Sequence, residues 1–202
     1  MLNDRSTPLA LLKSRRSGRP RDLIAPGPDA EQLREIVAVA LRTPDHGKLA
    51  PWRFVHVEPE QREALAGLLR RALLRSNPDR SPAELEAVER FARQAPCLLV
   101  ALSSPAASAK IPVWEQELSC GASLMNLLAG AHAMGFAAGW ITGWAAYDPE
   151  VASAFCRPGE RIAGFMFIGT PAYALEERPR PAVDEKLSRW EPPTGTPADN
   201  MA

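Results

Sequence analysis

Hydrophobic residues recur along this chain with the periods of helices and strands in turn. An amphipathic helix is predicted after Asp29, because Gln32 completes a capping box with it and apolar residues follow at helical spacing. These apolar residues are Leu33, Ile36, Val37, Ala40 and Leu41. Further helices are predicted from Pro8 after Ser6 or Thr7, over residues 60–74 and 82–93, and from Asp148-Pro149 to about Phe155.

Strands are predicted where apolar residues alternate or run together over a short length. Residues 52–57 alternate, and residues 97–102 form a continuous apolar run of the kind found in central strands. Residues 161–168 form another strand, stopped by Gly169-Thr170-Pro171. Residues 140–144 are interpreted as either a strand or an extended connector.

The longest apolar stretch covers residues 118–139, which contain no Asp, Glu, Lys or Arg in a chain that is 24% charged. We expect one helix over residues 115–134, opened by Glu115 and stopped near Gly135. One of its apolar faces carries Leu118, Ala122, Met125, Ala129 and Ala133, and another carries Leu124, Leu127, Leu128 and Ala131. A helix that is apolar on every face is surrounded by protein or by lipid.

A membrane span is disfavoured for this helix. No Lys or Arg cluster flanks it, and four polar residues interrupt it, namely Ser119, Ser123, Asn126 and His132. Gly121 and Gly130 would instead allow neighbouring backbones to approach closely, which suits a central helix or a subunit interface. His132 is predicted to be a core histidine with its hydrogen bonds satisfied.

Composition narrows the classes of partner that this protein is expected to bind. The 202 residues suffice for one domain, and the formal net charge of +0 gives no electrostatic case for nucleic acid or an anionic membrane. A small molecule is therefore the expected partner. The odd number of cysteines, Cys97, Cys120 and Cys156, suggests reduced core thiols, and residues 1–16 lack a signal-peptide core, so a cytoplasmic protein is expected.

The residues that carry candidate chemistry lie mainly in loops. Four cations crowd residues 13–20, and they either complement a helix C-terminus in solvent or form an anion site. The polar, proline-flanked segment 42–52 is a candidate functional loop, and the small residues of 103–112 are a candidate lid. Glycine-rich phosphate motifs and the nucleophile-elbow motif are absent.

Four motifs occur in a characteristic order. These are Arg15-Arg16-Ser17, Pro44-Asp45-His46 with Pro51-Trp52, Trp114-Glu115-Gln116-Glu117, and Gly135-Phe136 followed by Trp140. Together they resemble the nitroreductase superfamily of FMN-dependent reductases, in particular the small single-domain branch with a Pro-Asp-His loop. The resemblance extends over nearly the whole chain to about Pro171.

This resemblance implies an α+β fold, with a mixed, mostly antiparallel sheet wrapped by helices and a long buried central helix near a dimer axis. It implies a homodimer with FMN at the subunit interface. The FMN-binding domain would span residues 1–171. Residues 172–202 would be an extended tail packing on the partner subunit.

The resemblance also implies the residues of the site. Arg15, Arg16 and Ser17 would hold the FMN phosphate and ribityl chain. Arg42 and His46 would reach the cofactor from the partner subunit.

Two further segments are implied to contact the flavin. Trp140, Ile141 and Thr142 would run along the isoalloxazine, where backbone amides can face it. Arg180 matches a phosphate-binding position by a looser spacing, and Arg19 is a candidate for the pyrimidine edge.

The implied activity is transfer of hydride from NAD(P)H through flavin to a small acceptor such as a nitroaromatic or quinone, with no catalytic protein residue and no metal. Two alternatives stay open. One is a flavoenzyme of the same fold with another task, such as a dehydrogenase or reductive dehalogenase. The other is a non-catalytic flavin- or anion-binding protein.

Overall fold

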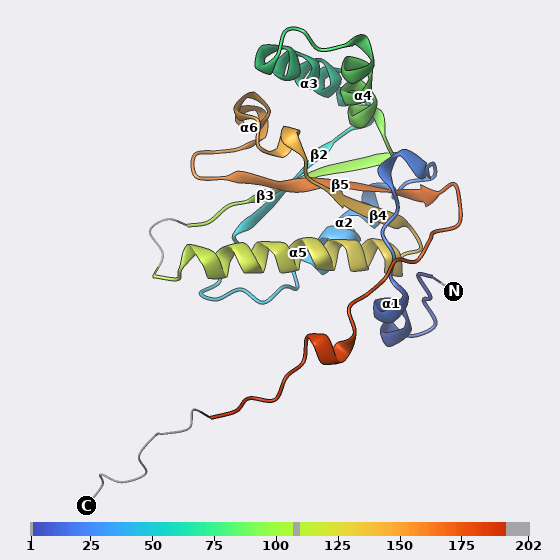
Figure 1. Cartoon of the computed structure of the whole chain (residues 1–202), viewed down its shortest axis with the longest axis vertical. Helices are drawn as coiled ribbons and strands as arrows, with labels where there is room; N and C mark the ends of the chain where they lie inside the picture. Colours follow the sequence, from blue (N-terminus) through green and yellow to red (C-terminus); the bar gives the residue numbers. More distant parts are fainter. Residues whose placement is uncertain (1, 107–109, 193–202) are drawn as a thin grey trace, which may run out of the picture.

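The fold is built on one five-stranded antiparallel sheet, seen in a computed structural model that describes residues 2–106 and 110–192 (Figure 1). The strands are β1 (Leu23–Ile24), β2 (Trp52–Val57), β3 (Cys97–Ser103), β4 (Ala137–Ile141) and β5 (Arg161–Pro171). Their order is β1-β5-β3-β2, and β4 pairs with the other side of β5. Every pair is antiparallel in the described chain, so the expected mostly antiparallel sheet is confirmed, with no parallel pair within it.

Strands β3 and β5 are buried on both faces because helices cover the two sides of the sheet. Figure 1 shows α5 (Val113–Ala133) and α2 (Ala30–Ala40) on one side, and α3 (Arg62–Ser76), α4 (Pro82–Arg93) and α6 (Pro149–Phe155) on the other. Successive strand residues therefore enter two separate cores. Leu98, Val100, Leu102, Phe165 and Phe167 enter the core under α3 and α4, whereas Cys97, Leu99, Ala101, Met166 and Ile168 pack toward α5.

Local capping explains where the helices begin. Thr7 accepts from the backbone N–H of Ala10 at the start of α1 (Pro8–Ser14), and Asp29 forms the predicted capping box with Gln32. Asp148 caps α6 in the same way. These predicted starts are confirmed, because a cap depends only on residues close in sequence.

Long-range pairing changes several predicted boundaries. Strand β5 continues through the predicted stop to Pro171, because β1 pairs with Thr170 and Pro171 beyond the end of β3. Residues 137–141 are the strand β4, so of the segment 140–144 only Trp140 and Ile141 lie in a strand, whereas Thr142 and Gly143 lie beyond it and Trp144 begins a 3-10 turn. The helix expected over 60–74 begins as a 3-10 turn, Pro59–Gln61, and continues as α3.

Helix α5 is not enclosed on every side by its own chain, so burial of its remaining side by a partner subunit stays a prediction. Leu118 is 53% exposed and Ala122 and Ala133 are exposed, so one apolar stripe is open in the single chain. Leu124, Leu127, Leu128 and Ala131 are buried against the sheet as expected. Within residues 2–106 and 110–192, no helix has the length and apolarity that crossing a membrane would require.

A buried ion pair fastens the loop before β5 to β2. The side chain of Glu160 is 4% exposed and accepts from Arg53 Nε at 3.0 Å and Nη2 at 2.5 Å. Ser104 Oγ at 2.8 Å and the backbone N–H of Arg157 at 2.7 Å complete its shell. These hydrogen bonds, those from Arg53 foremost, lower the pKa of Glu160 to about 2, although burial acts in the opposite direction.

We expect this carboxylate to make stability depend on pH. Its contribution is present above its ordinary pKa of 4.5 and is lost as pH falls toward about 2, because the folded-state pKa is depressed. At pH 7, Glu160→Gln should lower the free energy of unfolding by about 3 kcal/mol, measured by urea denaturation. The difference from wild type should shrink between pH 4.5 and 2.

Glu86→Gln is the matched control, because Glu86 is exposed on α4 and pairs only with Arg90 at the surface. It should change the free energy of unfolding by less than about 0.5 kcal/mol. A Glu160→Gln effect that stays constant down to pH 2 would contradict the assignment.

Candidate functional site

The cationic segment after α1 lies along the edge of β4. The backbone N–H of Gly18 donates to the carbonyl of Ala138 at 3.1 Å, and Arg15 Nη1 donates to Ser17 Oγ at 3.2 Å. The two chains approach so closely that a Cβ at Gly139 would lie 2.6 Å from the Gly18 carbonyl oxygen. Glycine at 139 therefore allows the Arg-Arg-Ser triplet to sit directly against the strand.

Strand β4 has one open edge, since it pairs only with β5. Both backbone groups of Ala138 point to that edge, because its N–H donates to His132 Nε2 at 3.2 Å and its carbonyl accepts from Gly18. Strand alternation directs the backbone groups of Trp140 to the same edge, whereas Thr142 lies just beyond the end of β4. The cation triplet and Trp140 thus lie along the same edge of the sheet.

Four arginines gather at the start of this edge. The pKa of Arg15 is lowered by burial first, and then by the positive charges of Arg180, Arg16 and Arg178. The structure therefore brings Arg180 to the triplet, although the sequence spacing was loose. Arg178 is a further cation that sequence reasoning missed, although the alternation Arg178-Pro179-Arg180-Pro181 was a usable signal.

The start of the C-terminal tail closes over the triplet. Arg16 Nε donates to the carbonyl of Glu176 at 2.6 Å, and Arg19 contacts the carboxylate of Glu176 at 3.5 Å. A cavity of about 210 Å³ lies here, lined by Arg16, Ser17, Gly18, Arg19, Asp22, Leu23, Pro171 and residues 173–176. Paired guanidiniums and a hydroxyl around such a space can hold a phosphate or carboxylate.

Arg42 and His46 lie elsewhere in the single chain. Their loop lies along α5: His46 Nδ1 is 2.7 Å from Glu115 Oε2, Ser119 Oγ donates to the Pro44 carbonyl at 2.6 Å, and Asn126 Nδ2 donates to Thr43 Oγ1 at 2.8 Å. Arg15 instead acts electrostatically on His132, near the C-terminal end of α5. At a rise of about 1.5 Å per residue, Glu115 is about 25 Å from His132 along the helix, whereas Asn126, beside Arg42, is only about 9 Å from it.

His132 supports the edge strand β4 by a hydrogen bond from the buried side of α5. It is fully buried on α5, and burial together with the charge of Arg15 lowers its pKa to about 4, so the ring is neutral at neutral pH. Its Nε2 accepts from Ala138, but Nδ1 has no partner in the part of the chain that the structure describes. The expected burial is confirmed, whereas only one of its two ring nitrogens is satisfied.

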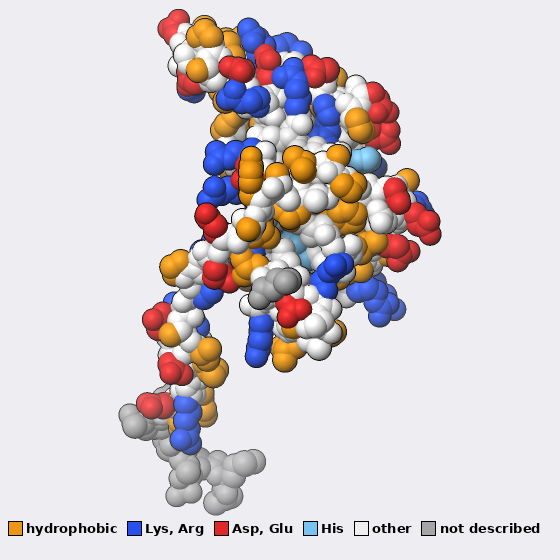
Figure 2. All heavy atoms as spheres, turned by 90° about the vertical axis from the view of Figure 1, so that its right-hand side faces the viewer, with side chains coloured by type: hydrophobic (Ala, Val, Ile, Leu, Met, Phe, Trp, Pro, Cys, Tyr) orange, Lys and Arg blue, Asp and Glu red, His pale blue; other side chains and the backbone are white. Residues whose placement is uncertain are grey.

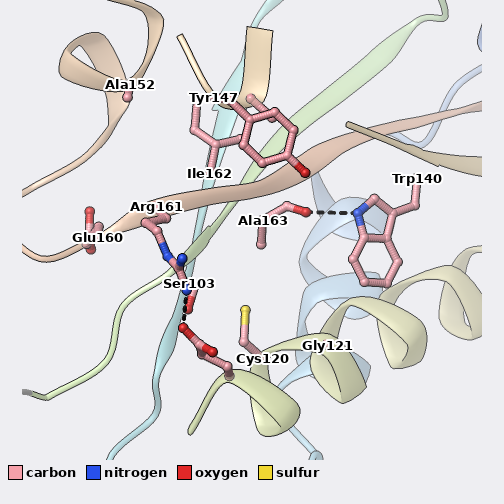
Figure 3. Close-up of a pocket in the computed structure, with 12 residues that line it drawn as sticks. Ser103, Cys120, Gly121, Trp140, Tyr147, Ala152, Glu160, Arg161, Ile162 and Ala163 are labelled. Carbon is pink, nitrogen blue, oxygen red and sulfur yellow. Dashed lines mark hydrogen bonds and ion pairs between the residues drawn. The ribbon is translucent and has the colours of Figure 1, made fainter. Parts of the chain in front are cut away.

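A larger cavity of about 510 Å³ lies beside Trp140 at the start of β5, lined by Cys120 and Gly121 of α5 and, from the α6 side, by Tyr147 and Ala152 (Figure 3). The indole Nε1–H donates to the carbonyl of Ala163 at 3.0 Å, which fixes the ring at the cavity wall. Cys120 and Gly121 of α5 form another wall, and an ion pair between Arg161 and Glu117 lies at one end. Nothing in the sequence marked these residues as neighbours.

The candidate lid, residues 103–112, borders the cavity beside Trp140 only in part. Ser103 ends β3 and lines the cavity, whereas residues 107–109 of the predicted lid lie outside the described residues. The buried Gln116 holds the segments on both sides of residues 107–109. Its Oε1 accepts from the backbone N–H of Ala106 at 2.8 Å, and its Nε2 donates to the carbonyl of Ile111 at 3.0 Å.

Fold and site together define an α+β protein with an edge strand lined by arginines beside a long central helix. The chain belongs to the nitroreductase family, because residues 12–170 match the model described as "Nitroreductase family". The resemblance inferred from the motifs is thereby confirmed at the level of the family. Its assignment to a branch with a Pro-Asp-His loop stays a prediction.

Two bacterial relatives are similar over most of their length. The protein named "Putative NAD(P)H nitroreductase YdjA" of Escherichia coli K12 is 34% identical over 164 residues, covering 81% of this chain and 87% of the relative. The "Putative NAD(P)H nitroreductase" of Haemophilus influenzae Rd is 38% identical over 181 residues, covering 88% of this chain and 95% of the relative.

Solved structures share the fold at lower identity. A nitroreductase-like family protein from Bacillus cereus matches with a TM-score of 0.77 and 21% identity, covering 92% of this chain and 97% of the other. A nitroreductase with bound FMN from Bacteroides fragilis matches with a TM-score of 0.67 and 21% identity, covering 91% and 98%. The NADPH:FMN oxidoreductase from Vibrio harveyi, complexed with NAD+, matches with a TM-score of 0.68 and 17% identity, covering 90% of this chain and 76% of the other.

Proposed function

We propose that this protein is an FMN-dependent oxidoreductase that takes hydride from NAD(P)H and reduces a small acceptor such as a nitroaromatic or quinone. The observation that carries the proposal is the gathering of Arg15, Arg16, Arg178 and Arg180 at one end of the open β4 edge. Family membership and the names of the two bacterial relatives support it.

The residues present suit FMN, an elongated molecule with a phosphate at one end and a flat ring system at the other. Arg15, Arg16, Ser17 and Arg180 would hold the phosphate, because guanidiniums donate paired, charge-assisted hydrogen bonds. Trp140, Ile141 and Thr142 would follow the ring, with outward backbone groups of β4 available as partners. The strand offers about 10 Å between Ala138 and Ile141 for such a ligand.

FMN, when bound, supplies the hydride-accepting and electron-donating chemistry that protein side chains lack. The chain contributes charge and position. Arg19 is 64% exposed and lies next to the triplet, with Glu176 at 3.5 Å, so it is available to a negatively charged ring edge. A cation held there would favour negative charge on the ring, and no nucleophile or acid of the protein is required.

We also propose a homodimer in which Arg42 and His46 complete the site of the partner subunit. The distance of about 25 Å along α5 between Glu115 and His132 keeps His46 away from the triplet of its own chain. The open stripe of α5 includes Leu118, whose side chain is exposed. This stripe is an apolar surface that a second copy can bury.

The C-terminal tail supports the same assembly. Figure 2 shows it running away from the body, with apolar side chains along its length. Tyr173, Val183, Leu187 and Trp190 are all more than two thirds exposed. We propose that the domain spans residues 1–171 and that the tail, 172–202, packs on the partner subunit; residues 193–202 lie outside the described part.

The cytoplasm is the proposed location. Cys97, Cys120 and Cys156 are free thiols, with Cys97 and Cys120 buried. Free thiols of this kind suit a reducing compartment.

The purified protein should be yellow, and anaerobic NADH or NADPH should bleach its flavin absorption because hydride reduces the ring. The measurement is one absorption spectrum before and after addition of the nicotinamide. A yellow protein that neither nucleotide bleaches would indicate the non-catalytic alternative. Colourless protein that takes up no added FMN would contradict the proposed function altogether.

Arg15→Ala should weaken FMN binding by about 1–3 kcal/mol, or roughly 5- to 150-fold in Kd, because one charged hydrogen-bonding partner is lost. Fluorescence titration of the apoprotein with FMN measures this. Arg90→Ala on α4 is the control, since Arg90 is exposed and pairs only with Glu86. Equal Kd values for the Arg15→Ala and Arg90→Ala variants would refute the phosphate assignment.

Leu118→Glu combined with Ala122→Glu should convert a dimer to monomers and release FMN, because two charges would be buried in the proposed interface. Sedimentation velocity measures the assembly, and the flavin spectrum measures FMN content. Arg90→Glu should leave both unchanged. A wild-type protein that sediments as an FMN-loaded monomer would exclude the shared site.

A further inference from the structure

A separate cavity lies at the C-terminal end of α5. Its volume of about 360 Å³ falls within the range of small-molecule pockets, about 300–1,000 Å³. Its walls come from the N-terminal segment 2–5, the end of α5, the turn into β4 and the segment 171–175. Figure 1 shows the chain after β5 passing the end of α5, close to α1. Residues 173–175 also line the cavity beside Arg16, so the two cavities share a wall.

His132 brings an unmet hydrogen-bond donor to this cavity, whose wall it helps to form. Its Nε2 accepts from the N–H of Ala138 at 3.2 Å, so the one proton of the neutral ring is on Nδ1. The side chain is fully buried, and Nδ1–H finds no acceptor among the residues that the structure describes. Because an unmet buried donor destabilises the folded chain, an acceptor atom supplied from the cavity would stabilise it.

Arg5 is the charged side chain of the cavity wall. Its guanidinium lies over the turn after α5, since a Cβ at Gly135 would be 2.7 Å from Arg5 Nη1. The adjacent acid, Asp4, accepts from the backbone of Ser6 instead, and within residues 2–106 and 110–192 Arg5 makes no ion pair or hydrogen bond. The dipole of α5 favours a cation at this place, but it uses none of the five N–H donors of the guanidinium.

The rest of the wall is mainly apolar. Leu2, Phe136 and Leu175 line it, and among the described residues no Asp or Glu does. The side chain of Asn3 is already occupied, because it accepts from the backbone N–H of Arg16 at 2.7 Å and donates to the Arg16 carbonyl at 3.3 Å. The cavity thus combines a cation and a neutral donor with an apolar surface. That combination suits a carboxylate carried on an apolar body.

We propose that this cavity binds a small aliphatic carboxylate, with Arg5 and the Nδ1–H of His132 as donors to the carboxylate oxygens. The hydrocarbon chain of the ligand lies against Leu2, Phe136 and Leu175. The inference is independent of the proposed function, because it assigns neither donor to FMN.

Hexanoate is the probe, and 1-hexanol is its uncharged counterpart with the same number of carbon atoms. Binding to the full-length protein as purified is followed by proton–nitrogen NMR, which reports the ring nitrogens of the histidines. The chain has three histidines, so His46 and His56 are internal controls for His132. The absorption spectrum of any bound flavin is recorded on the same samples.

We expect hexanoate to move the His132 Nδ1–H signal downfield, because this hydrogen gains a charged acceptor, while the signals of His46 and His56 stay in place. Arg5→Met, which keeps an apolar stem but removes the charge, should weaken hexanoate binding at least about tenfold in Kd. For wild type, 1-hexanol should bind at least about tenfold more weakly than hexanoate. Arg90→Met, at an exposed arginine of α4, should bind hexanoate like wild type.

A wild-type protein that binds no hexanoate would overturn the proposal. Equal Kd values for hexanoate and 1-hexanol, or for wild type and Arg5→Met, would do the same. Hexanoate that changes the flavin spectrum without moving the His132 signal binds at the flavin, and this result also overturns the proposal. The His132 signal is read on wild type, so the test does not depend on the folding of a variant.

Discussion

The candidate site depends on the peptide groups of Ala138. Its N–H is held by a buried neutral imidazole on α5, and its carbonyl holds the loop that carries the arginine triplet. A helix, an edge strand and a cationic loop are thus joined through one residue. Because His132 accepts here only through an unprotonated nitrogen, burial of that ring is part of what keeps the edge in place.

Charge gives this edge its chemical character. Four guanidiniums near one another raise the free energy of the unliganded chain, and this repulsion adds to burial, the larger cause, in lowering the pKa of Arg15. The carboxylates of Glu176 and Glu177 relieve the repulsion only in part, because Glu176 pairs with Arg19, outside the four, and Glu177 pairs with one of them, Arg180. A bound dianion such as a phosphomonoester would relieve it more fully, which connects the electrostatics of the fold to the proposed cofactor.

Helix α5 makes several separate contacts along its length. Its buried side supports the sheet, its N-terminal half fixes His46, and its C-terminal half carries His132. Its remaining apolar stripe is open in the single chain, and Gly121 opens a cavity rather than a packing contact. The uncharged character of this helix is therefore explained by several separate contacts, of which the sheet is only one.

The sequence by itself determined the features that depend on near neighbours. Caps at Thr7, Asp29 and Asp148 set the helix starts, and the apolar run after Cys97 set the central strand, because both signals act within a few residues. Its motif order also identified the family. Tertiary structure decided what depends on residues far apart in the chain. Pairing with β1 extended β5, the return of the tail brought Arg178 and Arg180 to Arg15, and α5 separated His46 from the triplet. These contacts join segments more than a hundred residues apart or opposite ends of one helix, and local periodicity carries no information about such distances.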